Sequence, residues 1–245
     1  MITPTLGIVL QQIKYGETSI IVKIYTQIYG LQSYIVKGVR ASKTKQKTAL
    51  YLPLTLLDMQ VYHSKKQQIQ YIKEAKIAYP YQNIYTQIQK STVVVFLAEV
   101  LQKCLNEEEA DVNLFRFLYQ SLIDFDKETA HYADFHLLFL VDLSRYLGFA
   151  PQMISSALQT KASLYFDLRE ACFISCRPTH PDYVENENAI LLKMLFNYST
   201  QTKPVAFCAE HRSFLLKCLI RYYALHLSDM GEIRSLDILH EVFTT

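Results

Sequence analysis

The hydrophobic period of this chain changes at Pro80, and that change constrains the fold more than any other feature. Before Pro80, apolar residues such as Ile20, Val22 and Ile24 alternate with their neighbours, a period typical of half-buried strands. After Pro80 they recur at helical spacing. The 245 residues exceed one typical domain of roughly 100–150 residues. The sequence therefore predicts a β domain at residues 1–78 and a helical domain at residues 79–245.

Five strands are expected in the first domain. They cover residues 6–13, 20–25, 31–37, about 50–63 and 67–76. Gly30 supplies a tight turn between the second and third strands, because glycine adopts positive φ without strain. Pro53 weakens the start of the fourth strand, since proline cannot donate to the ladder. Five short antiparallel strands of this size favour a small barrel of the oligonucleotide-binding (OB) type.

The second domain is expected to be helical. Its predicted helices cover residues 83–104, 134–147, 186–198, 210–228 and 235–243, and a further helix begins at Asp111 and carries Leu114, Phe117, Leu118 and Leu122 on one face. Asp111 is a good N-cap, and Gly148 followed by Pro151 is a common end signal. Residues 152–184 break the pattern and predict an irregular insert with a hairpin around Arg169. The fold class is therefore α+β: an N-terminal five-stranded OB-type β-barrel, then a larger all-helical domain with a short β-hairpin insert.

Charge is divided unevenly along the chain. Residues 1–90 hold 12 Lys+Arg against 3 Asp+Glu, a formal charge of +9, which leaves −7 for the remainder. No Asp or Glu occurs from Thr18 to Leu57. This asymmetry indicates a polyanion partner for the first domain, with a merely solvated charged face as the alternative. A basic loop beside a β surface can follow a phosphate backbone. The predicted phosphate contacts are Lys37, Arg40, Lys43, Lys45 and Lys47.

Tyrosine supplies a second possible contact to nucleic acid, because bases stack on aromatic rings whatever the sequence. The chain has 18 Tyr and no Trp. The β domain holds Tyr15, Tyr25, Tyr29, Tyr34, Tyr51 and Tyr62. Most of these are expected to pack in the core. Tyr25, Tyr29 and Tyr34 lie in a short hairpin near the basic loop, and they are predicted to contact bases.

Several classes of protein are excluded by what the sequence lacks. It has no P-loop, no dinucleotide fingerprint and no G-x-S-x-G or H-E-x-x-H motif, so we expect no enzyme activity, cofactor or small-molecule substrate. Five scattered cysteines favour reduced thiols. The start of the chain lacks a signal-peptide pattern, and no apolar run approaches the ~18–20 residues that span a bilayer. These features predict a cytoplasmic protein without membrane contact.

One cluster of cysteine and histidine residues contains the side chains that zinc prefers as ligands. Cys172, Cys176 and His180 follow one another at intervals of four, with Cys208 and His211 later. Zinc knuckles favour two ligands separated by two residues, and free cysteine is an ordinary core residue. The sequence therefore predicts no metal, and these five residues are the ligand pool if zinc is bound.

Several segments resemble the RecO family, the recombination mediators of bacterial DNA repair. Residues 15–19, 25–31 and 36–43 resemble its opening, including the Lys37-Gly38-x-Arg40 pattern. Residues 143–151 are similar to its Leu-Gly-Phe-Ala-Pro helix end, and residues 226–236 are similar to its C-terminal signature. These matches occur in the family's order along nearly the whole chain.

The resemblance implies an OB domain followed by a helical domain, and a non-enzymatic protein associated with the bacterial nucleoid. It implies binding of single- and double-stranded DNA and annealing of complementary strands. It also implies cooperation with a RecR-like protein to load RecA on strands coated by single-strand-binding protein. The alternative is a general OB-fold nucleic-acid-binding or assembly module without annealing activity.

This chain departs from the family pattern in two places. Many members carry two CxxC pairs, whereas residues 153–177 hold only Cys172 and Cys176, so the zinc site is expected to be lost. Some members place arginines that contact the acidic tail of the single-strand-binding protein where this chain has Ala133 and Asp134. That contact site therefore cannot be carried over to this chain.

Overall fold

The structure is a computed structural model that describes residues 2–39, 48–105, 110–130, 132–152, 164–197 and 207–244. Its contacts divide the chain into two compact units. The first comprises residues 1–129 and 233–242, and the second comprises residues 130–232 and 243–245. The first unit thus joins the β domain to helical segments. That residues 1–78 make a domain of their own stays a prediction.

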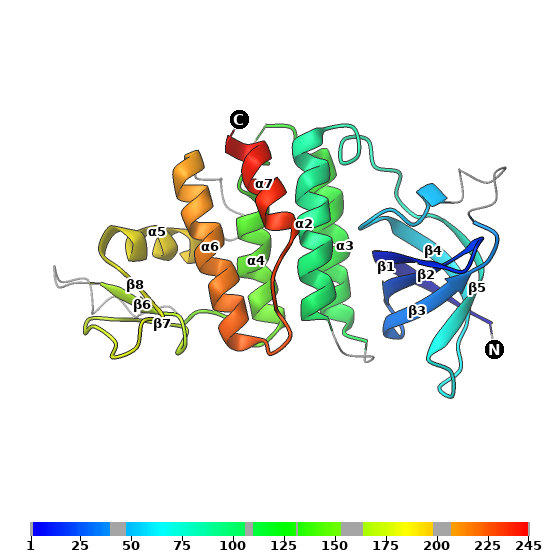
Figure 1. Cartoon of the computed structure of the whole chain (residues 1–245), viewed down its shortest axis with the longest axis horizontal. Coiled ribbons are helices and arrows are strands. Elements are labelled where there is room, and N and C mark those ends of the chain that lie inside the picture. The colour runs from blue at the N-terminus through cyan, green and yellow to red at the C-terminus, as the bar shows by residue number, and fades with distance from the viewer. Residues whose placement is uncertain are drawn as a thin grey trace. The chain divides into compact units, whose positions relative to one another are not determined.

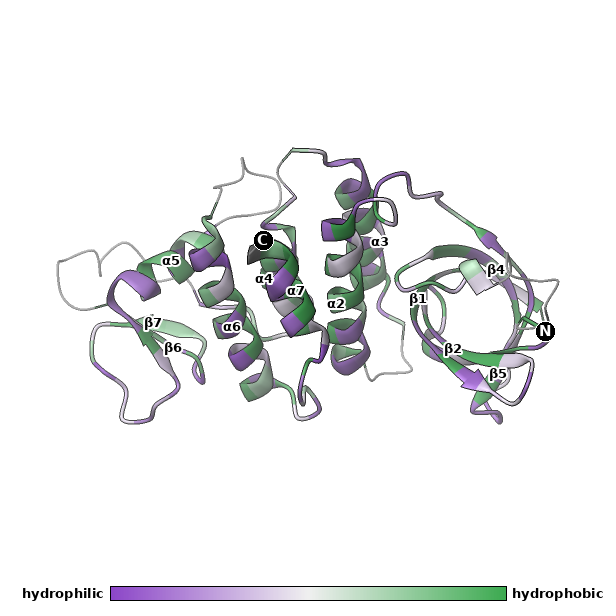
Figure 2. Ribbon diagram, turned by 45° about the horizontal axis from the view of Figure 1, so that its top comes forward, coloured by the Kyte–Doolittle hydropathy of each residue, from purple (hydrophilic) through white to green (hydrophobic). Residues whose placement is uncertain are grey.

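The first unit begins with a closed five-stranded barrel (Figure 1). Its strands are β1 (Ile2–Tyr15), β2 (Ser19–Thr26), β3 (Gly30–Val36), β4 (Leu56–Tyr62) and β5 (Ile69–Ile77). They close in the order β1-β2-β3-β5-β4, and only the β3–β5 pair is parallel. The strands form a ring in the view of Figure 2. The predicted five-stranded OB-type barrel is confirmed.

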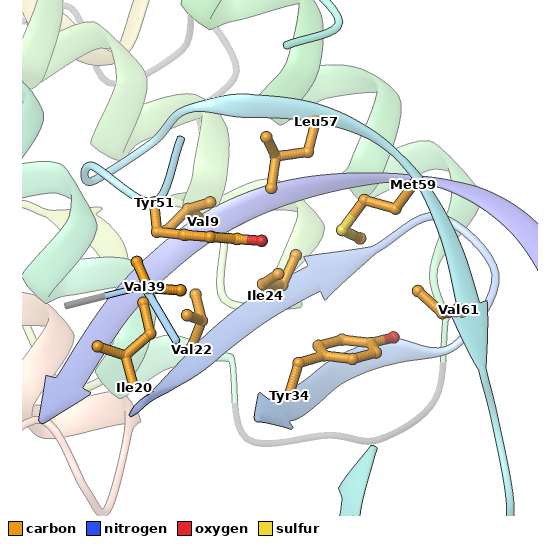
Figure 3. Packing of buried hydrophobic residues seen from close by; sticks show 10 residues of the cluster. All are labelled: Val9, Ile20, Val22, Ile24, Tyr34, Val39, Tyr51, Leu57, Met59 and Val61. Atoms are coloured by element: carbon orange, nitrogen blue, oxygen red, sulfur yellow. The ribbon is translucent and has the colours of Figure 1, made fainter. Parts of the chain in front are cut away.

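Alternating residues of the strands fill the barrel. Ile20, Val22 and Ile24 of β2 are at most 3% exposed, as their period of two predicts. Figure 3 shows Ile24 close to Met59 of β4, and Ile20 and Val22 beside Val39 in the same apolar cluster. Successive side chains of a strand point to opposite faces. Slipping the register of β2 by one residue would therefore move its whole apolar set to the outside of the barrel.

The predicted fourth strand is wrong at its start. Residues 50–55 form turns, and β4 begins only at Leu56. Leu54 has φ +58°, in the left-handed region, where an extended run cannot continue. The backbone there is fixed by neighbours: Leu54 N donates to Val9 O at 2.7 Å, and the Tyr81 hydroxyl donates to Leu54 O at 2.8 Å. The alternating leucines therefore pack without forming a strand.

The first unit also holds α2 (Ile88–Cys104), α3 (Val112–Lys127) and all but the last two residues of α7 (Ser235–Thr244). Asp111 caps α3 as predicted, accepting from Asn113 N and Leu114 N at 2.8 and 2.9 Å. The helix expected from residue 83 begins at Ile88 instead. Residues 82–84 use their backbone N–H groups elsewhere, donating to the carboxylate of Asp126 on α3 at 2.8–3.0 Å.

Two further polar contacts tie the helices of this unit together. The buried amine of Lys90 on α2 donates to Phe125 O and Asp126 O at 2.6 and 3.0 Å, near the end of α3. The carboxylate of Glu99, also on α2, accepts from Ser235 N and Ser235 Oγ at 2.9 and 2.6 Å. Glu99 thereby satisfies donors at the N-terminus of α7 that the helix itself leaves unpaired.

The second unit contains α4 (Phe135–Tyr146), α5 (Asn186–Asn197) and α6 (Ala209–His226). Its insert carries β6 (Tyr165–Asp167), β7 (Cys172–Ile174) and β8 (Tyr183–Glu185), in the order β7-β6-β8. The predicted hairpin is confirmed by the Phe166–Phe173 pair, and β8 is an additional strand. Among the residues described, no helix is long and apolar enough to cross a membrane.

Candidate nucleic-acid interface

The β2–β3 hairpin supports the predicted contact surface. Gly30 takes φ +61°, which the tight turn requires and most residues avoid. The Thr26 hydroxyl closes the turn: it donates to Gly30 O and accepts from Tyr29 N, both at 3.0 Å. Outward-facing residues of β2 and β3 are consequently held in fixed register, with Lys23 opposite Ser33 and Ile21 opposite Ile35.

Two of the tyrosines predicted to contact bases are buried in the interior of the first unit. Tyr34 is 0% exposed and points into the barrel, where Figure 3 shows its ring near Val61. Burial raises the pKa of its hydroxyl far above the usual range. Tyr25 is 2% exposed and stacks on Phe115 of α3, with ring centroids 6.1 Å apart. A base contact by either ring stays a prediction, and this burial is evidence against it.

Tyr29 is partly buried and already has several partners. Its ring stacks on His63 with centroids 3.8 Å apart and planes 12° from parallel. Its hydroxyl donates to Thr3 Oγ1 at 2.9 Å. A base could use only the ring face that His63 leaves uncovered. The role of Tyr29 as a base contact therefore stays a prediction for one face of its ring.

The predicted basic loop leaves the barrel at a fixed point. Lys37 is exposed just after β3, and its Nζ lies 5.9 Å from the centroid of the Tyr71 ring. Val39 is 1% exposed in the core, and the Thr48 hydroxyl donates to Val39 O at 3.3 Å. Val39 and Thr48, the described residues on either side of positions 40–47, are thus hydrogen-bonded to each other. Arg40, Lys43, Lys45 and Lys47 themselves lie outside the described residues.

Sequence reasoning missed the exposed Tyr71 and did not select Tyr62 or Tyr15, of which Tyr15 is 51% exposed. Tyr62 of β4 and Tyr71 of β5 are 45% and 44% exposed, and they are direct cross-strand partners. The outward position of Tyr71 follows from the inward position of its neighbour Gln70, which is 2% exposed. Its Nε2 donates to Ser64 O and Gln67 O, and its Oε1 accepts from Ser64 N. Because Gln70 satisfies the β4–β5 turn, its neighbour Tyr71 faces outward.

Cations dominate the described outer surface of the barrel. Its exposed or half-exposed lysines are Lys14, Lys23, Lys37, Lys65, Lys66, Lys73 and Lys76. The acidic residues there are Glu17, Asp58 and Glu74, and Asp58 is already paired with Lys76 at 3.1 Å. This surface can attract a polyanion even without the residues of the basic loop.

The insert holds an ion-pair network close to the cysteines weighed as zinc ligands. His180 Nε2 lies 3.0 Å from Asp167 Oδ2, and Asp182 pairs with Arg169 and Arg221 at 2.7 and 2.6 Å. In the described part of the chain, no three His, Cys, Asp or Glu residues are placed to hold a metal. That the protein binds no zinc stays a prediction.

We expect elemental analysis of the purified protein to find no stoichiometric zinc, since His180 faces Asp167 and residues 153–177 hold only two cysteines, Cys172 and Cys176. Cys172→Ser should leave the fold intact apart from a modest packing cost. A stoichiometric amount of zinc, lost together with helical signal in the Cys172→Ser variant, would contradict this prediction.

Asp134 stands where some family members place a basic contact site. It is 5% exposed, accepts from Phe207 N at 3.0 Å and lies 3.6 Å from Arg212 Nη1. Burial raises the pKa of this carboxyl, although the hydrogen bond from Phe207 and the charge of Arg212 act in the opposite direction. Asp134 thus connects the start of α4 to Phe207 and Arg212 within the second unit, and it provides no basic surface for an acidic partner.

Comparison with known proteins agrees with this arrangement. Residues 1–81 match the family described as "Recombination protein O N terminal", and residues 85–236 match "Recombination protein O C terminal". The chain is 34% identical to "DNA repair protein RecO" of Phocaeicola vulgatus, covering 100% of both chains. It is 36% identical to proteins of the same name from Flavobacterium johnsoniae, covering 98% of both chains, and from Bacteroides fragilis, covering 99% of this chain and 100% of the relative. The chain therefore belongs to the recombination protein O (RecO) family of DNA repair proteins.

Proposed function

We propose that this protein binds single- and double-stranded DNA through the outer wall of its barrel and anneals complementary strands during recombinational repair. The observation that carries the proposal is the position of Lys37. It is exposed just before Val39, whose carbonyl oxygen accepts from the Thr48 hydroxyl. Lys37, Arg40, Lys43, Lys45 and Lys47 are the proposed phosphate contacts. A closed OB-type barrel and membership of the RecO family support the same assignment.

The proposal needs no catalysis and no cofactor. A basic surface that binds two flexible strands screens their mutual repulsion and raises their local concentration. Bases that remain free to pair then form the duplex, whose own stability drives the reaction. ATP and metal ions have no part in this scheme, and the protein turns over no small-molecule substrate.

We extend the proposal to partners on the basis of the family. With a RecR-like protein, this chain would help to load RecA on strands coated by single-strand-binding protein in the bacterial cytoplasm, at the nucleoid. Residues 91–245 carry a formal charge of −7, so this helical half offers no basic surface of its own with which to clear a coated strand, and the partner would be required. The basic contact site that some family members use cannot be carried over to this chain, where the buried Asp134 stands.

Mixing two complementary oligonucleotides that carry a fluorescent donor and acceptor tests annealing directly. We expect the protein to accelerate the appearance of energy transfer without ATP or metal, and the acceleration to fade as salt rises, because phosphate contacts weaken with salt. Strands of unrelated sequence serve as the control. Binding without acceleration at low salt would instead favour a general OB-fold module that lacks annealing activity.

A further inference from the structure

A line of outward-facing apolar and aromatic residues runs around the barrel. Each member is the cross-strand partner of the next. The line consists of Ile2, Tyr62, Tyr71, Ile35, Ile21 and Ile13, on β1, β4, β5, β3, β2 and β1. Its members are exposed or half-exposed, and Ile2, Tyr62, Tyr71 and Ile13 are each more than 40% exposed. A soluble barrel would ordinarily carry polar residues at most of these positions.

Tyr62 and Tyr71 are the aromatic members of the line. Direct cross-strand partners place their Cβ atoms about 5 Å apart on one face of the sheet. Tyr71 is also the partner of Ile35 on β3 through the parallel β3–β5 pairing. The β2–β3 face is where OB barrels usually bind single strands. The two rings therefore extend that face across β5 to β4.

The charges around the two rings match an anionic chain. Lys37 Nζ lies 5.9 Å from the Tyr71 ring centroid, and Lys23 occupies the next outward row, opposite Ser33. Ser33 in turn faces Ile69 of β5. On β5 itself, exposed Lys73 stands beside exposed Glu74 at the bulge opposite Gln60. Lysines thus flank the rings on the β3 side, where a phosphate backbone would run.

We propose that Tyr62 and Tyr71 form a stacking site for unpaired bases of single-stranded DNA, with Lys37 neutralising the adjacent phosphate. This inference rests on the proposed function, and it adds residues on β4 and β5 that the usual OB surface does not include. An exposed tyrosine ring offers a π-face that any base can cover, so the site is insensitive to sequence. A protein partner would gain no advantage from the lysines unless it were acidic.

The site distinguishes the substrate of annealing from its product. In a duplex the bases already stack on one another and cannot cover a tyrosine ring, whereas phosphates remain accessible to lysines. Tyr62 and Tyr71 therefore hold a strand only while it is unpaired, and the basic residues hold both forms. Release of the paired strand from the two rings follows from base pairing itself.

Fluorescence anisotropy with oligothymidylate and with a duplex of equal length tests this site in the full chain. Tyr62→Ala with Tyr71→Ala should weaken single-strand binding by about 5- to 150-fold for each stacked base lost. Affinity for the duplex should not change. The matched control is Tyr146→Ala on α4, a residue 42% exposed outside the barrel, which should leave both affinities unchanged.

Conservative variants separate stacking from apolar contact. Tyr62→Phe with Tyr71→Phe should retain single-strand binding, because the rings remain. Tyr62→Leu with Tyr71→Leu should lose single-strand binding. Leucine keeps an apolar surface but has no aromatic ring on which a base can stack. Leucine variants that bind as well as the natural protein would overturn stacking and indicate an apolar docking surface. An equal loss for single strand and duplex would also overturn it.

The absence of tryptophan from the chain provides an independent test. Tyr71→Trp introduces a sole tryptophan, whose fluorescence should fall when oligothymidylate binds and stay constant with an abasic strand of the same length. Quenching by both strands, or by neither while both bind, overturns the stacking site. If the natural protein binds no DNA at all, the proposed function itself fails, an outcome distinct from normal binding by the alanine variants.

Discussion

Replacing Lys37, Arg40, Lys43, Lys45 and Lys47 together by glutamine should lower the affinity for single-stranded DNA for every sequence alike. Each phosphate contact contributes about 0.7 to the slope of log affinity against log salt, so five contacts contribute up to about 3.5. With that slope, the contacts account for a loss on the order of 100-fold between 50 and 200 mM salt. The variant should show a correspondingly flatter salt dependence in an anisotropy titration.

A comparison of equal charge changes distinguishes local contacts from net charge. Neutralising Lys43, Lys45 and Lys47 should flatten the salt dependence, whereas neutralising Lys127, Lys193 and Lys217 on α3, α5 and α6 should not. Both triple variants lose the same formal charge. Equal effects of the two would show that only net charge matters, and an unchanged quintuple variant would place DNA on another surface.

The elements that sequence predicted well are those with a local cause. Alternation along Ile20, Val22 and Ile24 gave β2, since one face of that strand is buried throughout. Asp111 gave the start of α3, because a carboxylate can satisfy the first free N–H groups of a helix. Gly148, at φ +85°, follows the end of α4. Each of these signals acts within a few residues.

The errors arose where distant residues decide the local structure. The alternation from Leu50 to Leu56 predicted a strand, but Leu54 takes a left-handed conformation that is bonded to Val9 and to Tyr81. The helix expected from residue 83 starts at Ile88, because the preceding backbone donates to Asp126 more than forty residues later. No pattern near residue 83 or residue 54 contains that information.

The candidate site stays a prediction, and the choice of tyrosines depends on which side of the barrel each ring faces. Nothing in the neighbouring sequence distinguishes Tyr34 from Tyr71, yet Tyr34 is buried and Tyr71 is exposed. On β5 the polar residue Gln70 faces inward because it bonds the β4–β5 turn, which reverses the usual rule that polar side chains face water. Bulges after Val9 and Gln60 shift the alternation further.

Asp126 ties the segment that follows the barrel, residues 82–84, to α3. Its carboxylate is 1% exposed and accepts three backbone N–H groups, from Gln82, Asn83 and Ile84. Burial raises the pKa of Asp126, but these hydrogen bonds and the charge of Lys90 outweigh burial, so the pKa lies below its usual value. The ionised form is therefore the one that the folded protein stabilises.

Asp126→Asn should destabilise the protein by about 2–3 kcal/mol, because an amide nitrogen would face a backbone donor and the charge that favours Lys90 would be lost. Asp124→Asn is the matched control: Asp124 is exposed on the same helix, and its carboxylate accepts from the Gln120 side chain. It should change stability by less than about 0.5 kcal/mol. Urea unfolding followed by circular dichroism measures both.

The pH dependence of this difference follows from the direction of the pKa shift. A carboxyl whose pKa is lower in the folded state than in the unfolded chain contributes its full stability above the unfolded pKa, about 3.9. That contribution is lost as pH falls through the folded pKa, since the folded protein must then take up the proton. The gap between the natural protein and Asp126→Asn should therefore be constant near neutral pH and narrow below about pH 4. A gap that stayed constant into that acidic range would show that the carboxylate charge of Asp126 does not hold residues 82–84 against α3.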